Sequence, residues 1–409
     1  MRKHSEYPSH WKRKLLDDVA IRGTGHTPSQ SYPEYWDGDI KWVSLADSSL
    51  LDKLFIYTTS KKISLLGIKK SSAVIHPKGT VLLSRDAGVG KSAIMAEDMA
   101  VSQHFITWNC SIPSQELYNV FLYYWLQSMK PEFERMAIGS TVKTIGLPYF
   151  TKLMISFPPL KEQIAISNML SICDLVIEKT RKLIDVKEAK YKWLQQQLII
   201  KSSQNNKNWR QCRICDIADR IQRKSNGAEY PILTISSSAG FVLQEEKYSR
   251  FMAGKSVEDY ILIQRGEFAY NKGNSLRFQF GCIFELKDYD EALVPHVYVC
   301  FKLHNEVNPD YLGHVFAADY LKRQLGALVK TGVRNNGLLN IRPEEFMSVT
   351  VPIPPAHKQA FIAEILNTAR QEINLLKKQV EAYRKLKRGL MQKLLTGQWR
   401  VKADQEELL

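Results

Sequence analysis

"PPLKEQIAISNML" (158–170) and "PPAHKQAFIAEIL" (354–366) are two stretches of similar sequence, and they decide how the whole chain is organised. The match extends without a gap from residues 158–199 to residues 354–395. Proline is favoured at the start of a helix, and the segments after the paired prolines contain no further proline and only one glycine, Gly389. We therefore predict a long helix after each pair of prolines.

Apolar and aromatic side chains recur along both segments at alternating spacings of four and three residues, which is typical of a coiled coil. The first helix leads the chain out of one globular unit and the second leads it back. We therefore predict an antiparallel coiled-coil pair in which the two apolar seams bury each other, each helix about 58 Å long at 1.5 Å per residue. The alternatives are that each helix packs on its own domain or pairs with another chain. The predicted helix-pair interface consists of Ile166, Leu170, Ile177, Ile184, Tyr191 and Leu194 in the first helix and Ile362, Leu366, Ile373, Val380, Tyr383 and Leu390 in the second.

Sequence landmarks that precede the two helices also occur twice and in the same order. "LLDDVA" (15–20) matches "RICDIA" (213–218), and "PKGTVLLSR" (77–85) matches "QRGEFAYNK" (264–272). Strands are predicted at 79–84, 92–96, 104–108, 267–271, 281–286 and 296–303, and shorter helices at 116–129 and 308–325. The predicted fold is therefore two mixed α/β (α+β) globular domains, joined by the two long helices and related by a pseudo-twofold internal repeat.

Charge and composition restrict the partners of this chain. Its formal net charge is +15 and its pI is about 9.3, which favours an anionic partner such as nucleic acid. The apolar run 120–126 is too short to span a bilayer and the N-terminus lacks the apolar core of a secretion signal, so we expect a cytoplasmic protein without a membrane partner. Cys212 and Cys215 form a C-x-x-C pair, but no second pair or histidine lies at zinc spacing, and we predict no metal site.

The stretch "SRDAGVGKSA" (84–93) resembles the end of a phosphate-binding P-loop. A P-loop has the pattern G-x-x-x-x-G-K-[ST], and Arg85 stands where its first glycine is required. A helix must follow to hold the phosphate, whereas residues 92–96 are predicted to be a strand. The second copy has "NKGNSLRFQ" (271–279) at this place, without a G-K-S sequence. We therefore interpret the stretch as the basic tip of a β-hairpin, and we predict no nucleotide site and no catalytic residue in this chain.

Loops at matching places in the two copies carry basic and amide side chains beside small residues. Arginine and lysine can bind phosphates or guanine, asparagine can read adenine, and small residues let the backbone approach DNA. A single charged loop is usually only solvated, but several in register across a repeat indicate a surface that faces DNA. The predicted DNA-binding residues are His26, Ser29, Ser84, Arg85, Lys91 and Lys143 in the first unit and Lys272, Asn274, Arg277 and Arg334 in the second.

Several of these segments resemble the specificity subunits of type I restriction–modification systems over nearly the whole chain. "GHTPSQSYPEYWDGDIKWVS" (25–44) resembles the family's G-G-T-P-S…Y-W-x-G-x-I-x-W opening, with His26 in place of the second glycine. "FPPLKEQIAI" (157–166) resembles the family's P-P-L-x-E-Q-x-x-I helix start, and the second copy departs from it at Lys358. "SRDAGVGKSAI" (84–94) resembles the R-D-x-x-x-G-K-x-A-I hairpin of the family's recognition domains.

The resemblance implies target recognition domains at 1–157 and 203–353, conserved spacer helices at 158–202 and 354–398, and a tail at 399–409. Each recognition domain would read one half of a bipartite, asymmetric site in double-stranded DNA, while the helices set the spacing and dock two methyltransferase subunits. Those partners would carry S-adenosylmethionine and methylate adenine N6, and restriction/translocase subunits would use ATP and Mg²⁺. This chain would be non-catalytic and would bind no cofactor itself.

Two other functions are compatible with the sequence. One is a stand-alone tandem DNA-binding protein without enzymatic partners, and the other is the specificity chain of a related multi-subunit restriction system. Tight binding by the isolated chain, without a co-purifying methyltransferase, would favour the first of these.

Overall fold

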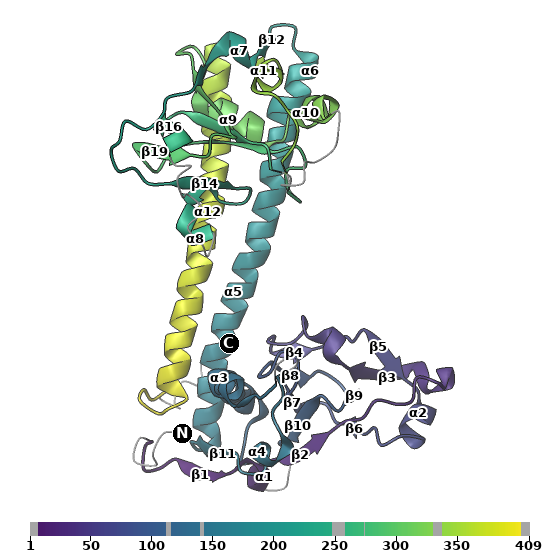
Figure 1. Ribbon diagram of the computed structural model, residues 1–409. Coiled ribbons are helices and arrows are strands. Elements are labelled where there is room, and N and C mark those ends of the chain that lie inside the picture. Colours follow the sequence, from purple (N-terminus) through teal and green to yellow (C-terminus); the bar gives the residue numbers. More distant parts are fainter. Residues whose placement is uncertain are drawn as a thin grey trace. The chain divides into compact units, whose positions relative to one another are not determined.

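The computed structural model of the chain describes residues 7–111, 116–139, 143–247, 258–273, 275–329 and 338–401. Contacts divide the chain into two compact units (Figure 1). Unit 1 contains Met1–Arg181 and Gln379–Leu409, and unit 2 contains Lys182–Lys378. Each unit therefore combines one globular domain with part of both long helices.

Unit 1 is built on a five-stranded sheet of order β2-β10-β7-β8-β4, beside a four-stranded sheet of order β5-β3-β9-β6. Its strands are β1 (Lys12–Leu15), β2 (Ile21–Thr24), β3 (Trp36–Val43), β4 (Phe55–Ile56), β5 (Lys61–Ile63), β6 (Ile75–His76), β7 (Val81–Ser84), β8 (Ser92–Met95), β9 (Met99–Val101), β10 (Phe105–Asn109) and β11 (Met154–Phe157). Its shorter helices are α1 (Leu16–Val19), α2 (Leu65–Lys69), α3 (Asn119–Met136) and α4 (Leu147–Phe150), with 3₁₀ turns at Pro33–Tyr35 and Leu45–Asp47. The apolar face of α3 packs into the core, where Phe121, Phe133 and Phe150 are fully buried.

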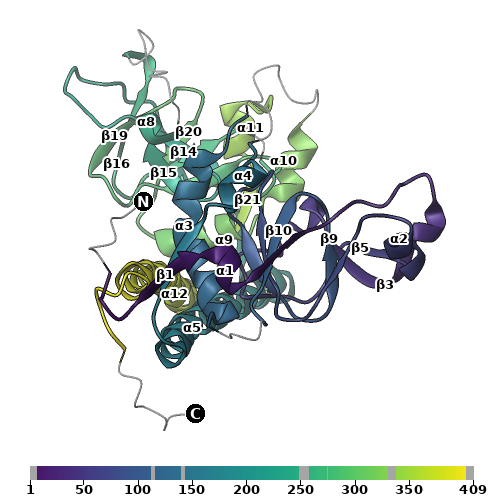
Figure 2. The same ribbon diagram turned by 90° about the horizontal axis from the view of Figure 1, so that it is seen from below.

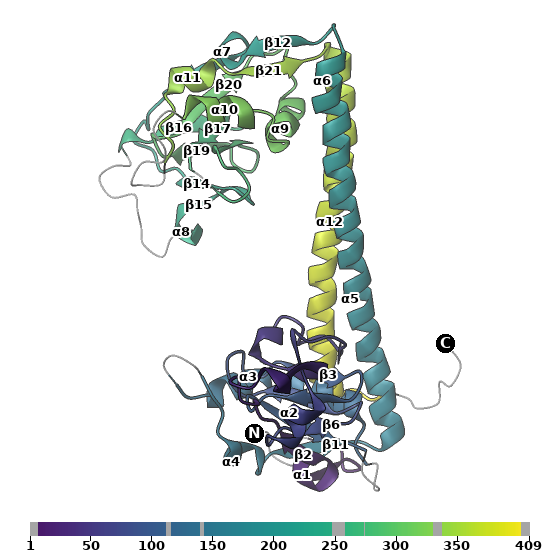
Figure 3. The same cartoon turned by 90° about the vertical axis from the view of Figure 1, so that its right-hand side faces the viewer.

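Unit 2 repeats this plan. Its four-stranded sheet has the order β13-β20-β17-β18, the counterpart of β2-β10-β7-β8 in unit 1. Its strands are β12 (Arg210–Arg213), β13 (Ala218–Ile221), β14 (Leu233–Ser236), β15 (Gly240–Leu243), β16 (Ile261–Gln264), β17 (Phe268–Asn271), β18 (Cys282–Glu285), β19 (Glu291–Val294), β20 (Val299–Leu303) and β21 (Thr350–Ile353). Its shorter helices are α7 (Ile214–Ile217), α8 (Gln244–Lys247), α9 (Pro309–Ala317), α10 (Lys322–Leu328) and α11 (Pro343–Met347). In both units an antiparallel two-stranded ribbon, β1–β11 or β12–β21, leads directly into a long helix (Figure 3).

The six strands predicted from the sequence are present, and so is the mixed α/β fold in two copies. One prediction was wrong: residues 308–325 do not form one helix, because α9 ends at Ala317 and α10 starts at Lys322. Asp319 lies between them with a φ of 54°, a left-handed conformation that aspartate tolerates better than most residues and that interrupts helical hydrogen bonding.

The long helices are α5 (Leu160–Gln195) and α12 (Ala356–Leu394), and α5 continues through a π-helical segment (Gln196–Lys201) into α6 (Ser202–Asn205). In unit 1, Asp174 of α5 pairs with Lys387 of α12 at 2.5 Å. In unit 2, Glu188 of α5 pairs with Lys377 of α12 at 2.6 Å. In unit 1 the start of α5 (Ile166, Leu170) shares a core with the end of α12 (Leu394), and in unit 2 the start of α12 (Ile362, Leu366) shares a core with Ile199, just after α5, so the helices run antiparallel in each unit.

Eight of the twelve predicted helix-pair residues are buried, and the other four are half-buried. Some of these residues pack against the globular domains as well as against the other long helix. In unit 1, Ile166 and Leu170 of α5 join Leu394 of α12 in the core of the globular domain. In unit 2, Ile362 and Leu366 likewise belong to the core of that domain. The ends of both helices are therefore part of the globular cores, a combination of the predicted pairing and one of its alternatives.

An equivalent glutamine fixes the start of each long helix. In unit 1 the buried Gln163 accepts a hydrogen bond from the amide of Tyr118 at 2.8 Å and donates to the carbonyl of Pro158 at 2.9 Å. In unit 2 Gln359 accepts from the amide of Asn308 at 2.8 Å and donates to the carbonyl of Pro354 at 3.0 Å. The glutamine that recurs in the sequence repeat thus makes equivalent hydrogen bonds in both units.

Candidate nucleic-acid interface

The stretch 84–93 forms a β-hairpin in unit 1, as the sequence predicted. β7 pairs antiparallel with β8, and the loop is closed by a hydrogen bond of 2.8 Å from the amide of Ser84 to the carbonyl of Lys91. Gly88 and Gly90 adopt φ angles of 100° and 85°, which residues with a side chain rarely adopt. A strand follows Lys91 where a P-loop requires a helix, so the local structure is not that of a P-loop.

The polar side chains at the base of this hairpin are engaged within the protein. The buried hydroxyl of Ser84 donates to the carbonyl of Asp86 at 2.6 Å. Arg85 has 19% of its side chain exposed, and its Nε lies 3.6 Å from a carboxylate oxygen of Asp86. The other carboxylate oxygen of Asp86 lies 2.6 Å from Nδ1 of His104. These contacts give the hairpin a polar base that holds it in place.

Lys91 connects the hairpin to Ser48, at the end of the 3₁₀ turn Leu45–Asp47. Its ammonium group donates to the carbonyl of Ser48 at 3.1 Å and to the hydroxyl of Ser48 at 2.9 Å. A DNA phosphate would have to join or replace these contacts. The roles of Ser84, Arg85 and Lys91 in DNA binding remain predictions.

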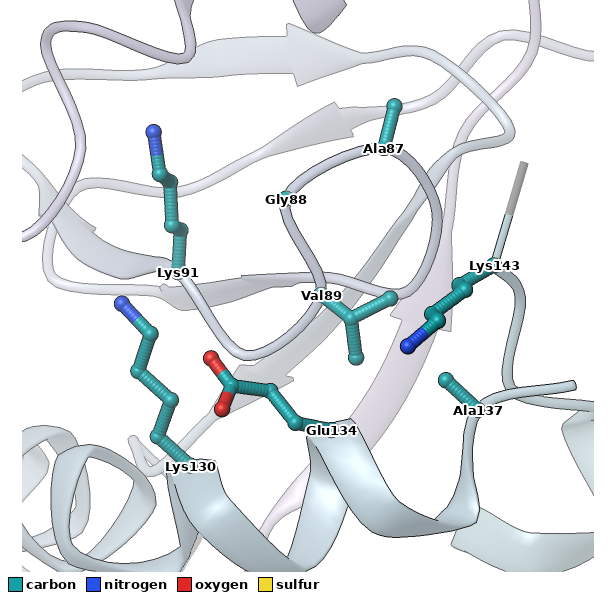
Figure 4. Close-up of a pocket in the computed structure, with 8 residues that line it drawn as sticks. All are labelled: Ala87, Gly88, Val89, Lys91, Lys130, Glu134, Ala137 and Lys143. Carbon is teal, nitrogen blue, oxygen red and sulfur yellow. The ribbon is translucent and has the colours of Figure 1, made fainter. Parts of the chain in front are cut away.

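A basic pocket of about 510 Å³ opens beside the hairpin tip (Figure 4). Lys91 reaches it from the hairpin, Lys130 and Glu134 from α3, and the exposed Lys143 from the loop after α3. Lys130 also forms an ion pair with Asp52 at 2.8 Å. Three lysines and one glutamate line the pocket, and the local charge stays positive when Asp52 is counted with them, which suits a polyanion. The sequence analysis did not identify Lys130. This residue lies in α3, and only the folded structure brings α3 next to the hairpin.

The segment with His26 and Ser29 lies over β3 and β9, the two central strands of the four-stranded sheet β5-β3-β9-β6 of unit 1. Both residues are exposed, and their backbone carbonyls accept hydrogen bonds from the indole nitrogens of Trp42 (3.1 Å) and Trp36 (3.2 Å). Gly25 lies against strand β9 so closely that a Cβ atom would stand 1.7 Å from a backbone oxygen. The tryptophans of the predicted motif therefore hold this segment in place and leave its polar side chains exposed.

The corresponding hairpin of unit 2 joins β17 to β18, which pair antiparallel. Arg277 is exposed, with its guanidinium carbon 5.2 Å from the ring centroid of the buried Phe278. The carbonyl of Lys272 accepts a hydrogen bond of 3.1 Å from the amide of Leu339. Lys272 and Arg277 thus belong to one loop, whereas Asn274 and Arg334 lie outside the residues that the structure describes.

Two further observations concern the predictions of no metal site and no membrane partner. Within the described residues no group of three or more His, Cys, Asp or Glu side chains could hold a metal ion, and Cys212 and Cys215 are free thiols. No helix in that part of the chain is long and apolar enough to cross a membrane.

The chain is similar in sequence and in fold to known proteins. Residues 8–188 match the model of the family described as type I restriction modification DNA specificity domain. The chain is 30% identical over 183 residues to the MjaIX specificity subunit of Methanocaldococcus jannaschii, an alignment covering 44% of this chain and 42% of that relative. It is 24% identical over 443 aligned positions to the MjaVIII specificity subunit of the same organism, covering 97% and 94% of the two chains. Its fold is similar to the crystal structure of the type I restriction–modification S subunit from M. genitalium, with a TM-score of 0.56, 16% identity and coverage of 96% and 98%.

Proposed function

Since the chain belongs to the specificity subunits of type I restriction–modification systems, we propose that it reads a bipartite, asymmetric sequence in double-stranded DNA, one half with each unit. The observation that carries this proposal is the repeated sheet, β2-β10-β7-β8 in unit 1 and β13-β20-β17-β18 in unit 2. The same plan presents a different hairpin in each unit, "SRDAGVGKS" in one and "NKGNSLRFQ" in the other. Two units of one fold with different loop chemistry suit a site whose halves differ.

Phosphate contacts and base contacts have separate tasks in this proposal. Lysines of the pocket beside the unit 1 hairpin, Lys130 and Lys143 among them, would bind phosphates and position the unit. Arg277 and the exposed His26 and Ser29 would lie close enough to DNA to read base edges. The net charge of +15 supports a large electrostatic contribution to binding.

The helices α5 and α12 would set the distance between the half-sites and dock two methyltransferase subunits. At 1.5 Å per residue, the 36 residues of α5 extend about 54 Å and the 39 residues of α12 about 58 Å. In this proposal the chain itself is non-catalytic. Methylation of adenine N6 with S-adenosylmethionine belongs to the methyltransferase partners, and ATP- and Mg²⁺-dependent translocation and cleavage to the restriction subunits.

A methylation map tests the proposal directly. The chain is expressed with a modification subunit in cells without other adenine methylation, and N6-methyladenine is located by sequencing. We expect a motif of two unlike half-sites separated by a fixed number of unspecified base pairs. A single continuous motif, or methylation without sequence preference, would contradict the proposed function.

A matched deletion tests the spacing role of the helices. Residues 182–188 of α5 and 372–378 of α12, all in unit 2, lie opposite each other in the register set by the ion pairs Lys187–Glu372 and Lys377–Glu188. Removing both heptads shortens each helix by about 10 Å with little rotation, because seven residues are close to two turns. We expect the unspecified gap to shorten by about three base pairs at 3.4 Å each, with both half-sites unchanged. An unchanged gap would refute the spacing role.

A further inference from the structure

Two large apolar side chains are much more exposed than the others in the described part of the chain. Leu276 has a relative exposure of 112% and Ile138 one of 83%, whereas the next most exposed large apolar side chains reach 64%. Single exposed apolar residues are common on protein surfaces and need no explanation. These two, however, belong to the loops for which the sequence predicted DNA contacts, one in each unit.

Leu276 stands at the tip of a turn that is fixed by hydrogen bonds. The amide of Ser275 donates to the carbonyl of Phe278 at 3.1 Å, and the amide of Phe278 donates back to the Ser275 hydroxyl at 3.0 Å. Phe278 is buried and anchors the turn in a core cluster of unit 2. Leu276 and Arg277 are the two residues between these anchors, and both project from the loop.

Ile138 is held in a comparable way in unit 1. It exchanges two backbone hydrogen bonds of 3.0 Å with Thr144, so its backbone is ordered although its side chain is exposed. The adjacent residue Ala137 and the nearby Lys143 line the basic pocket beside the hairpin tip. The amide of Ile145, the residue after Thr144, donates to the carbonyl of Arg85 in the hairpin at 3.0 Å.

Both side chains therefore combine three properties: hydrogen bonds that hold the backbone at or beside the residue, high exposure, and a cationic neighbour. The cations would attract the phosphates of a duplex. An exposed leucine or isoleucine beside them would then face the base pairs in the groove. Apolar side chains of this size enter base steps in other DNA-binding proteins, where they unstack two bases and kink the duplex.

We propose that Leu276 and Ile138 are apolar wedges that insert between adjacent base pairs, one in each half-site. This inference rests on the proposed function, since it requires that the loops face DNA. It adds a contact that is independent of charge and of hydrogen-bonded base readout. It also makes the deformability of particular base steps part of the sequence preference, because steps that unstack easily accept a wedge at lower cost.

The test uses the full chain and a duplex that carries the motif found in the methylation map, with 2-aminopurine placed in turn at positions in the unit 2 half-site. We expect fluorescence at one step to rise when the wild-type chain binds, because an unstacked 2-aminopurine is less quenched. Leu276→Ala should abolish this rise and weaken binding about 10-fold or more, the factor expected when most of a leucine loses its contact. The salt dependence of binding should stay the same, because no charge is removed.

Matched variants distinguish insertion at a base step from a general loss of exposed apolar surface. Leu276→Met keeps an apolar side chain and should retain the fluorescence rise. Leu375→Ala removes another exposed leucine, from α12, and should behave as wild type. Ile138→Ala should act in the same way on the unit 1 half-site, with the exposed Ile21 changed to alanine as its control.

Three results would overturn the inference. One is a Leu276→Ala chain that binds its site as wild type does. Another is an unchanged 2-aminopurine signal at every position with the wild-type chain. The third is a loss fully reproduced by replacing thymine with uracil in the duplex, since Leu276 would then touch a thymine methyl group in the groove. If the wild-type chain shows no preference for its motif, the proposed function fails, and this outcome is distinct from the other three.

Discussion

We expect the stability of unit 2 to fall as the pH is lowered from 7 to 5, because of one buried histidine. His314 of α9 is 2% exposed and contacts both α5 and α12. In unit 1, Tyr124 of α3 contacts Asp174 of α5 and Lys387 of α12 in a similar way. Figure 2 shows the two long helices end-on, with α3 and α9 beside them. Nδ1 of His314 lies 2.8 Å from the Tyr191 hydroxyl and Nε2 lies 2.9 Å from Oδ1 of Asn367. The side-chain NH₂ of Asn367 donates to Asp310, so Oδ1 of Asn367 accepts a hydrogen bond from Nε2 of His314. Nδ1 of the neutral imidazole can then accept from the Tyr191 hydroxyl.

The magnitude follows from the pKa of His314, which burial lowers from 6.5 to about 4. The hydrogen bond to Asn367 and the carboxylate of Asp310 oppose this shift, while the charges of Arg370 and Lys287 add to it. The unfolded chain therefore binds a proton on this histidine at a higher pH than the folded chain does. The resulting stability is fully present above pH 6.5 and is lost as the pH falls toward 4. Between pH 7 and 5 the loss is about 2 kcal/mol, or roughly 20-fold in an opening equilibrium.

Hydrogen exchange of the amides of α9, corrected for the intrinsic effect of pH, measures this opening. In the wild-type chain the protection should fall about 20-fold between pH 7 and 5. His314→Gln should have lower protection at pH 7 and should lose most of this dependence. His357→Gln removes an exposed histidine at the start of α12 and serves as the control. Equal pH dependence in the wild-type and His314→Gln chains would refute the reasoning.

Three other substitutions have expected outcomes. Gln163→Ala leaves the Tyr118 amide and the Pro158 carbonyl without partners and should cost unit 1 about 2–3 kcal/mol in denaturant unfolding; a cost below about 0.5 kcal/mol would contradict this. Leu170→Ala removes a fully buried side chain from the core shared by α5 and α12 and should cost about 2–5 kcal/mol in the same assay, whereas a neutral effect would show that the helix end is not part of that core. Gly25→Ala would place its Cβ 1.7 Å from the carbonyl oxygen of Val101, so we expect faster hydrogen exchange over residues 26–31, and wild-type exchange there would exclude this close packing.

Much of the fold was predictable because its signals are local. The paired prolines, the spacing of apolar side chains and the recurrence of the pattern depend only on residues close together in sequence. They gave both long helices, six strands and the two-copy plan. The local signal failed at Asp319, where one residue in a left-handed conformation divides a segment that is apolar and periodic on both sides.

The sequence predicted which loops and hairpins carry the candidate DNA-facing residues, but not the directions and contacts of their side chains. The sequence placed Lys91 in a β-hairpin, and the structure confirms the hairpin, with Lys91 at the residue that closes the loop opposite Ser84. The ammonium group of Lys91 binds Ser48, which is far from it in the chain. The sequence placed Ser84 at the end of a strand as a candidate DNA contact, whereas its hydroxyl is buried and donates to the carbonyl of Asp86. The direction of a side chain depends on which distant elements pack around it, and no local pattern carries that information.

The sequence by itself determined that this protein is two copies of one α/β plan, each followed by a long helix, because helical and strand periodicity arise from backbone geometry over a few residues. Only the tertiary structure decided that Leu394 near the end of α12 packs with Ile166 and Leu170 at the start of α5, in the core of the first domain. It also decided that Lys130 and Lys143 share a pocket with Lys91 and that the side chains of Leu276 and Ile138 are highly exposed. The physical reason is that burial and side-chain direction are set by contacts between segments far apart in the sequence, and the chain has these contacts only once it is folded.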